Sequence, residues 1–258
     1  MRVATLLPLA SALLAALASP ARSQDWTFAD GFETGTTCAW SLRVGSADPC
    51  TPVPMTVLQI RLDATTRLVQ LSDVVITGRT VDGRHYWVGD DPISEPDHGL
   101  FVFRGASASP LDPSFDLGAH VELTGLSLEF DSTPPGNRRT EIFSGDPVLL
   151  GSGSPPVPFG GLPLSTLGAI DAGEPLEGVL VVTSNAIVTA TGPDDRLTLS
   201  DATGTMVMDD LAFDYSAASY PVGTCFGSVT GVSHLDVVAD ERLLLPTSAA
   251  DLVAGPCP

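Results

Sequence analysis

The composition of this 258-residue chain is that of a folded, acidic protein. Hydrophobic residues make up 43% of it, enough to fill a core, so disorder is excluded despite the charge. Asp and Glu number 31 against 12 Lys and Arg, for a formal net charge of −19. Because affinity for nucleic acid comes largely from basic side chains that displace counterions, this balance disfavours polyphosphate partners.

Residues 1–23 have the pattern of a secretory signal peptide. Arg2 precedes the apolar run Val3–Ala18, and Ala21-Arg22-Ser23 fits a small-x-small cleavage site. The run is shorter than the ~20 apolar residues that a membrane-spanning helix needs. Cleavage after Ser23 removes two arginines and no acid, so the mature charge becomes 10 − 31 = −21. We therefore expect a secreted protein, extracellular or periplasmic, with no membrane insertion.

Residues 24–55 are predicted to form an N-terminal capping segment, in which Phe28, Phe32 and Trp40 cover one side of the first domain. The run Phe28–Gly35, followed by Cys38–Ser41, resembles the opening of many exported bacterial proteins of varied function.

Four cysteines in an exported chain indicate two disulfides, for which three pairings are possible. We favour Cys38–Cys50 and Cys225–Cys257, because each pair lies within one segment. A zinc site is less expected, because no Cys-x-x-Cys or His-x-x-x-His spacing accompanies these residues.

The rest of the chain predicts β-structure throughout. Short β-branched and aromatic runs, separated by Gly, Pro and Asp turns, fill residues 56–150 and again residues 162–258. Residues 151–161 are rich in Gly, Ser and Pro and are predicted to be a linker. We expect two domains of the same class.

An internal repeat relates the two domains. The stretch Leu117–Leu126 returns, lightly edited, as Val222–Val232, each copy opened by a glycine and closed by Thr-Gly. Other collinear matches support a duplication: Arg196–Asp201 with His85–Asp90, and Gly204–Met208 with Gly99–Phe103. The repeat places Tyr86 and Val88 in a core and turns His85 and Trp87 outward.

Five or six short strands in each domain, with a glycine-marked curled strand, predict an all-β protein of two tandem OB-like Greek-key barrels. Motifs such as Val74–Gly78, Tyr86–Asp90 and Gly99–Phe103 resemble the OB-type domains of secreted bacterial proteins that accompany extracellular nucleases. Glu174–Val181 resembles the companion domain of the same proteins. The resemblance implies a nucleic-acid-binding accessory role, although no catalytic nuclease domain follows in this sequence.

A search for catalytic motifs finds neither a Gly-x-Ser-x-Gly elbow nor a phosphate loop, and the four histidines have no paired spacing. The remaining candidate is a ligand-binding face on the first barrel, an aromatic platform among basic residues that suits stacked bases. Its members are Arg79, Arg84, His85, Trp87 and Arg104. Alternatively, Trp87 packs under the N-terminal segment.

The loop after the Tyr86 strand is a weak calcium candidate, because Asp90, Asp91, Glu95 and Asp97 cluster there. An exposed acidic loop is the preferred interpretation, and no cofactor is predicted. The sequence thus predicts a secreted, non-catalytic binding protein whose partner is an extracellular protein or polymer of unknown identity. The alternatives are a nucleic-acid-binding accessory to a separate nuclease and an enzyme of unrecognised type.

Overall fold

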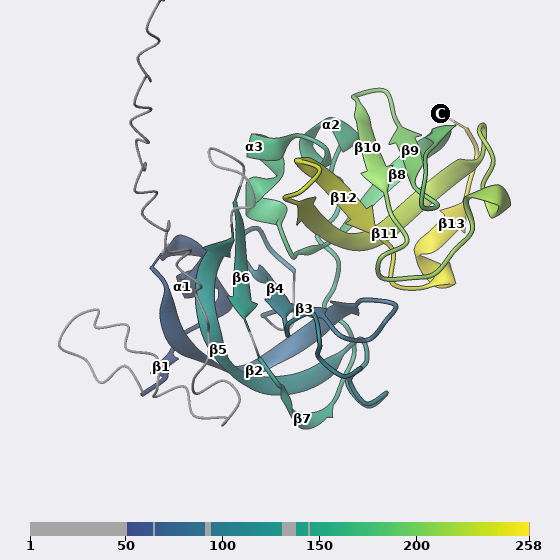
Figure 1. The fold of residues 1–258 in the computed structure, drawn as a ribbon. Coiled ribbons are helices and arrows are strands. Elements are labelled where there is room, and N and C mark those ends of the chain that lie inside the picture. The colour runs from purple at the N-terminus through teal and green to yellow at the C-terminus, as the bar shows by residue number, and fades with distance from the viewer. Residues whose placement is uncertain (1–50, 64, 91–93, 131–137, 144, 258) are drawn as a thin grey trace, which may run out of the picture. The chain divides into compact units, whose positions relative to one another are not determined.

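The computed structural model describes residues 51–257 apart from residues 64, 91–93, 131–137 and 144. All of the described residues belong to one compact unit, residues 43–258. The predicted signal peptide, the aromatic residues of the capping segment and the Cys38–Cys50 pair lie outside the described residues. Strands are the main regular structure of the described chain and form two barrels (Figure 1).

The first barrel is a closed sheet of five strands in the order β2-β3-β4-β6-β5, with β5 pairing back to β2. The strands are β2 (Arg67–Arg79), β3 (Tyr86–Gly89), β4 (Gly99–Phe103), β5 (Ala119–Phe130) and β6 (Arg139–Phe143). All neighbouring pairs are antiparallel except β4 and β6. Two short strands, β1 (Val53–Pro54) and β7 (Val148–Ser152), extend the sheet at β2 and β5, and helix α1 (Val57–Leu62) lies between β1 and β2.

The second barrel repeats this order as β8-β9-β10-β12-β11, closed by β11 against β8, with β10 and β12 parallel. Its strands are β8 (Leu180–Thr191), β9 (Leu197–Ser200), β10 (Thr205–Met208), β11 (Cys225–Asp236) and β12 (Glu241–Leu245), and β13 (Leu252–Ala254) extends the sheet at β11. The short helices are α2 (Leu164–Leu167), α3 (Ile170–Gly173), η2 (Glu174–Leu176), η3 (Ala217–Ser219) and η4 (Ala249–Asp251). The predicted all-β class with two OB-like barrels is confirmed.

The glycines that close the two copies of the repeated stretch, Gly125 and Gly231, have the same structural role in their barrels. Gly125 pairs with Val69, and Gly231 pairs with Val181. A Cβ on Gly125 would stand 2.3 Å from a methyl of Ile142, and one on Gly231 would stand 2.7 Å from the backbone of Leu245. Both curled strands therefore need a glycine where the next strand crosses closely.

The register of the repeat differs from the prediction at one strand. Trp87 pairs with Phe101 in the first barrel, and Thr198 pairs with Val207 in the second. Since Trp87 and Thr198 hold the same place, Val207 corresponds to Phe101, one residue away from the predicted match of Gly204–Met208 to Gly99–Phe103. A shift of one residue turns a strand over, and only the corrected register keeps apolar side chains inside both barrels.

Each barrel has its own hydrophobic core. Tyr86 and Val88 are fully buried in the first, and Leu197 and Leu199 in the second, so the predicted inward positions are confirmed. A third buried cluster is shared by the two barrels: it joins Trp87 and Phe101 to Leu180, Val232, Leu243 and Leu245. The barrels thus pack through a hydrophobic interface of their own.

The predicted disulfide between Cys225 and Cys257 is confirmed. It ties the start of β11 to the chain just beyond β13, closing a loop with a sequence separation of 32. Among the described residues, no helix combines the length and the apolar character needed to cross a bilayer.

Candidate functional site

Trp87 does not form the open stacking platform that the sequence suggested. Its indole is fully buried in the shared cluster, 5.2 Å from the Phe101 ring centroid, and Nε1 donates to Nδ1 of His234 on β11 at 3.3 Å. The side chain does point away from the core of its own barrel, as predicted. The second barrel covers it, so the expectation that it is available to stack a ligand is wrong.

The other predicted residues of that face lie near one another but are engaged. Arg104 holds Asp146 at 2.7 Å and donates to the carbonyls of Arg84 and Ser109. Arg84 reaches the Ala106 carbonyl at 3.3 Å, and Arg79 reaches that of Asp112 at 3.5 Å. These contacts hold turns in place rather than leaving cationic groups open.

His85 stacks on Phe103 with ring centroids 4.6 Å apart and accepts the Arg104 backbone N–H at Nδ1. Partial burial lowers the pKa of His85, so the ring is neutral at physiological pH. Of the two aromatic rings in the predicted platform, His85 is partly buried and Trp87 is fully buried.

The predicted calcium loop does not gather its carboxylates among the described residues. Asp90 is 2.8 Å from Nδ1 of His98, and the Asp97 backbone N–H donates to the Pro175 carbonyl. Asp91 lies outside the described residues. Within the described part of the chain, no group of three or more His, Cys, Asp or Glu side chains has a geometry that could hold a metal ion.

A buried charge network crosses the boundary between the barrels. Glu174, on η2, contacts Arg61 of α1 at 2.6 Å and Arg242 of β12 at 2.8 Å. Glu177 follows one turn later, with Oε2 3.7 Å from Arg61 and 3.9 Å from Arg242. The segment that leads into the second barrel thus lies between a helix of the first barrel and a strand of the second.

Three of these four side chains are sealed from solvent. The exposed fractions are 1% for Arg61, 0% for Arg242 and 1% for Glu177, whereas Glu174 is 46% exposed. Burial raises the pKa of Glu177 to about 8, and the nearby Arg61 guanidinium opposes that rise. Because removing one member would leave a buried charge unpaired, the network holds its three elements together.

A second buried group, His234, links the barrels beside this network. It lies between Trp87 and Arg139 of β6, whose Nη1 is 3.3 Å from His234 Nε2 and also donates to the Leu235 carbonyl. A neutral imidazole has one acceptor nitrogen, so only one of these two donors is hydrogen-bonded to the ring. Burial and the guanidinium of Arg139 keep the pKa of His234 well below 6.5.

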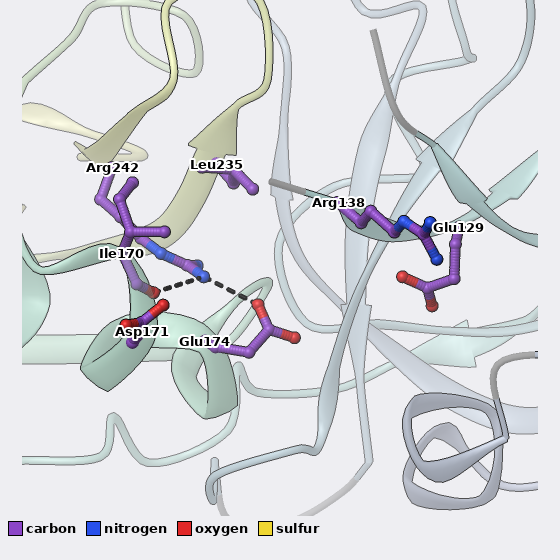
Figure 2. A pocket seen from close by; sticks show the side chains of 7 residues that line it. All are labelled: Glu129, Arg138, Ile170, Asp171, Glu174, Leu235 and Arg242. Carbon is purple, nitrogen blue, oxygen red and sulfur yellow. Dashed lines mark hydrogen bonds and ion pairs between the residues drawn. The ribbon is translucent and has the colours of Figure 1, made fainter. Parts of the chain in front are cut away.

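A cleft with a volume of about 370 Å³ opens next to the charge network. Figure 2 shows its lining side chains in two groups. One group comes from the second barrel and its lead-in helices: Ile170, Asp171, Glu174, Leu235 and Arg242. Facing it are Glu129 of β5 and Arg138, the residue before β6. Both barrels are therefore needed to form the cleft.

The seven lining residues are mostly charged. They include four charged groups at the surface and two aliphatic side chains, but no Ser, Cys or His that could act as a nucleophile or a base beside one. Glu174 is held by both arginines, so its carboxylate has a fixed orientation. Such an arrangement of fixed charge against an apolar wall is typical of ligand recognition.

Sequence reasoning missed this cleft. One signal was present: Arg242 interrupts the strand-like run Glu241–Leu245, and an arginine among leucines at an inward position indicates a buried ion pair. Nothing in the sequence showed that Arg61, far away in the chain, would share its partner.

Comparisons with known proteins supply no relative: no protein-family model matches the chain, and no curated protein matches it at a significant level. Function must therefore be argued from the site itself.

Proposed function

We propose that this chain is an exported, non-catalytic binding protein whose ligand is recognised in the cleft between its two barrels. The observation that carries the proposal is the cleft itself, which has charged side chains on opposite walls contributed by different barrels. The signal-peptide pattern of residues 1–23 supports export, and the Cys225–Cys257 disulfide suits an oxidising compartment.

The packing between the barrels supports a preformed site. The shared cluster buries Trp87 and Phe101 under four aliphatic side chains, and the charge network adds Arg61 and Arg242 on either side of Glu174. A site whose walls are already fixed loses little conformational entropy when it binds. The two barrels therefore act as one body rather than as separate modules on a flexible linker.

The alternative of a nucleic-acid-binding accessory loses its main argument. Stacking of single strands on OB-folds needs exposed aromatic rings with basic side chains along the backbone path. Here the indole of Trp87 is buried, Arg104 is neutralised by Asp146, and the net charge of −19 opposes polyphosphates.

The test is affinity capture from the medium of the source culture, using the chain after removal of the predicted signal peptide. The cleft variant Ile170→Trp fills the cleft with a bulkier side chain. The matched control is Val222→Trp, which adds the same ring at an exposed position just before β11. This position is away from the cleft, because the cleft residue of β11, Leu235, lies at the opposite end of the strand. Circular dichroism of both variants verifies that each is folded.

The wild-type protein and Val222→Trp are expected to retain the same molecular species, and Ile170→Trp is expected to lose it. Mass spectrometry of the eluate should find that species chemically unchanged. The cleft is not the ligand site if the immobilised wild type, Val222→Trp and Ile170→Trp all retain the species equally. The same holds if none of the three retains any species. A shortened or modified species contradicts the non-catalytic role and favours an enzyme.

A further inference from the structure

We propose that Glu177 is a proton-operated switch at the contact between the two barrels. While its side chain is protonated, Arg61 and Arg242 both stay on Glu174, and when it ionises, it draws them away. The inference concerns the contact between the barrels, and it does not depend on a ligand in the cleft. It follows from how two glutamates share the same two arginines and from how deeply each glutamate is buried.

Of the two glutamates, only Glu174 receives short contacts from the arginines. Nη2 of Arg61 lies 2.6 Å from Oε1 of Glu174, and Nη2 of Arg242 lies 2.8 Å from Oε2. Oε2 of Glu177 is instead 3.7 Å from Nη1 of Arg61 and 3.9 Å from Nη1 of Arg242, beyond hydrogen-bond range. Among the described residues, nothing donates a hydrogen bond to either oxygen of Glu177, and neither Nη1 atom has an acceptor. Both guanidiniums thus present an unused donor to a carboxylate that lacks one.

Burial makes the missing hydrogen bonds important. The side chain of Glu177 is 1% exposed, whereas that of Glu174 is 46% exposed and can be hydrated. An ionised carboxylate that is buried without a hydrogen-bond donor is costly, and taking up a proton removes the charge. Burial raises the pKa of Glu177 to about 8, the Arg61 guanidinium opposes this rise, and the Glu174 carboxylate adds to it. The side chain is therefore mostly neutral at pH 7.

The neighbouring elements supply no other charge that takes the place of this proton. The charged groups that act on Glu177 are Arg61 of α1, Glu174 of η2, Arg242 of β12 and, most weakly, Arg139 of β6. Two further titratable side chains lie on segments that are hydrogen-bonded through their backbone to residues 175–178: His234 on β11 and Asp97 in the loop before β4. In the described part of the chain, neither donates a hydrogen bond to the Glu177 carboxylate. Arginine keeps its proton near neutral pH, so the proton on Glu177 is the charge that can vary here.

Ionisation of Glu177 gives both guanidiniums a second partner. The nearest donors to the buried carboxylate are the unused Nη1 groups of Arg61, in the first barrel, and Arg242, in the second. Turning either guanidinium toward Glu177 takes it from Glu174, whose two contacts join α1 to β12. Since Glu174 and Arg242 also line the cleft, as Figure 2 shows, one wall of the cleft changes together with the contact between the barrels.

The direct test is a ¹³C NMR titration of the glutamate carboxyl groups, on the chain after removal of the predicted signal peptide. The Glu177 signal is identified by sequential assignment and by its loss in Glu177→Gln. The sequential assignment alone is sufficient if that variant does not fold. We expect the signal to titrate with a midpoint near pH 8, whereas an exposed glutamate titrates near pH ~4.3. A midpoint below neutral pH overturns the proposal.

The same titration tests whether the arginines respond. The guanidinium ¹³Cζ signals of Arg61 and Arg242 are expected to shift with the midpoint of Glu177, because each guanidinium exchanges one carboxylate partner for another. Arg104 is the matched control, since it is paired with Asp146 and is not among the groups that act on Glu177. If Glu177 titrates while the signals of Arg61 and Arg242 stay unchanged, Glu177 is a buried acid without a switching role, and the proposal is overturned.

Stability provides an independent measurement. The unfolded chain loses the Glu177 proton near pH 4.5 and the folded chain near pH 8, so stability should fall as the pH rises between these values. Relative to Glu177→Gln, which cannot ionise, the folding equilibrium constant of the wild type should drop by up to about tenfold per pH unit, measured by urea denaturation. The control is Glu241→Gln, which removes a 39% exposed carboxylate from the residue before Arg242 and should follow the wild type. Parallel curves for the wild type and Glu177→Gln from pH 6 to pH 8 would overturn the proposal.

Discussion

The two barrels have the same strand order but present different outer faces. Both use the same strand order, and both have a register irregularity near the end of the first strand, between Ile76 and Gly78 and between Val188 and Ala190. The outward pair on the second and third strands is Trp87 with Phe101 in the first barrel but Thr198 with Val207 in the second. The two barrels therefore share their strand order and their inward positions, and they differ on this outer face.

This difference between the outer faces explains how the two barrels pack against each other. In the first barrel, the face that OB-folds use for ligands is occupied by the second barrel, through Leu180, Val232, Leu243 and Leu245. The second barrel has no aromatic pair at the equivalent place. One barrel thus provides the aromatic surface and the other provides the aliphatic cover, and the cleft forms at the edge of this contact.

The largest expected loss of stability comes from replacing Trp87, the residue that most distinguishes the outer faces of the two barrels. Trp87→Ala removes a fully buried indole from the shared cluster and leaves His234 without its donor. We expect the free energy of unfolding to fall by about 3–5 kcal/mol, measured by urea denaturation. Thr198→Ala, at the equivalent position of the second barrel, should cost less than about 1 kcal/mol. Similar losses for both variants would show that the indole has no special role.

A smaller effect is expected where the barrels approach through their backbones. A Cβ on Gly99 would stand 2.2 Å from the carbonyl carbon of Gly178, whereas the equivalent residue in the second barrel, Thr205, has an exposed side chain. Gly99→Ala should therefore lower stability by about 1–3 kcal/mol. The control is Gly151→Ala, which has no atom within 4 Å of the added carbon. A neutral Gly99→Ala variant would mean that the barrels separate easily.

The smallest expected effect is a pH dependence of stability that arises from His234, at the contact between the two barrels. His234 pairs with Leu243 on β12, and Leu128 holds the equivalent place in the first barrel, so only one copy has a titratable group there. The groups that face His234 are Trp87 of β3, Phe101 of β4 and Arg139 of β6, and Arg242 of β12 acts from nearby.

Burial lowers the pKa of His234 in the folded chain well below 6.5, so below that pH the unfolded chain binds a proton that the folded chain does not. Stability should therefore fall as the pH drops from about 6.5, by up to about 1.4 kcal/mol per pH unit. The measurement is the difference in unfolding free energy between the wild type and His234→Gln across pH 7.5 to 5. If the two curves run parallel, His234 titrates alike in both states.

The architecture could be predicted from local patterns, and the candidate site could not. Alternation placed Tyr86 and Val88 inward, the repeated Thr-Gly marked Gly125 and Gly231, and the spacing of Cys225 and Cys257 gave the confirmed disulfide. These features depend on residues close in sequence or on a period of two. The cleft depends on Arg61, Glu129, Glu174 and Arg242, which come together only when two barrels are packed against each other.

The sequence by itself determined that Trp87 points out of its own barrel, because strand side chains alternate. Only the tertiary structure decided what lies beyond that face, and the answer was the second barrel rather than a ligand. An outward aromatic residue has the same local pattern whether water, a ligand or another domain covers it. The free energy that distinguishes these cases comes from burial by residues that are distant in the sequence. A local sequence pattern does not show that burial.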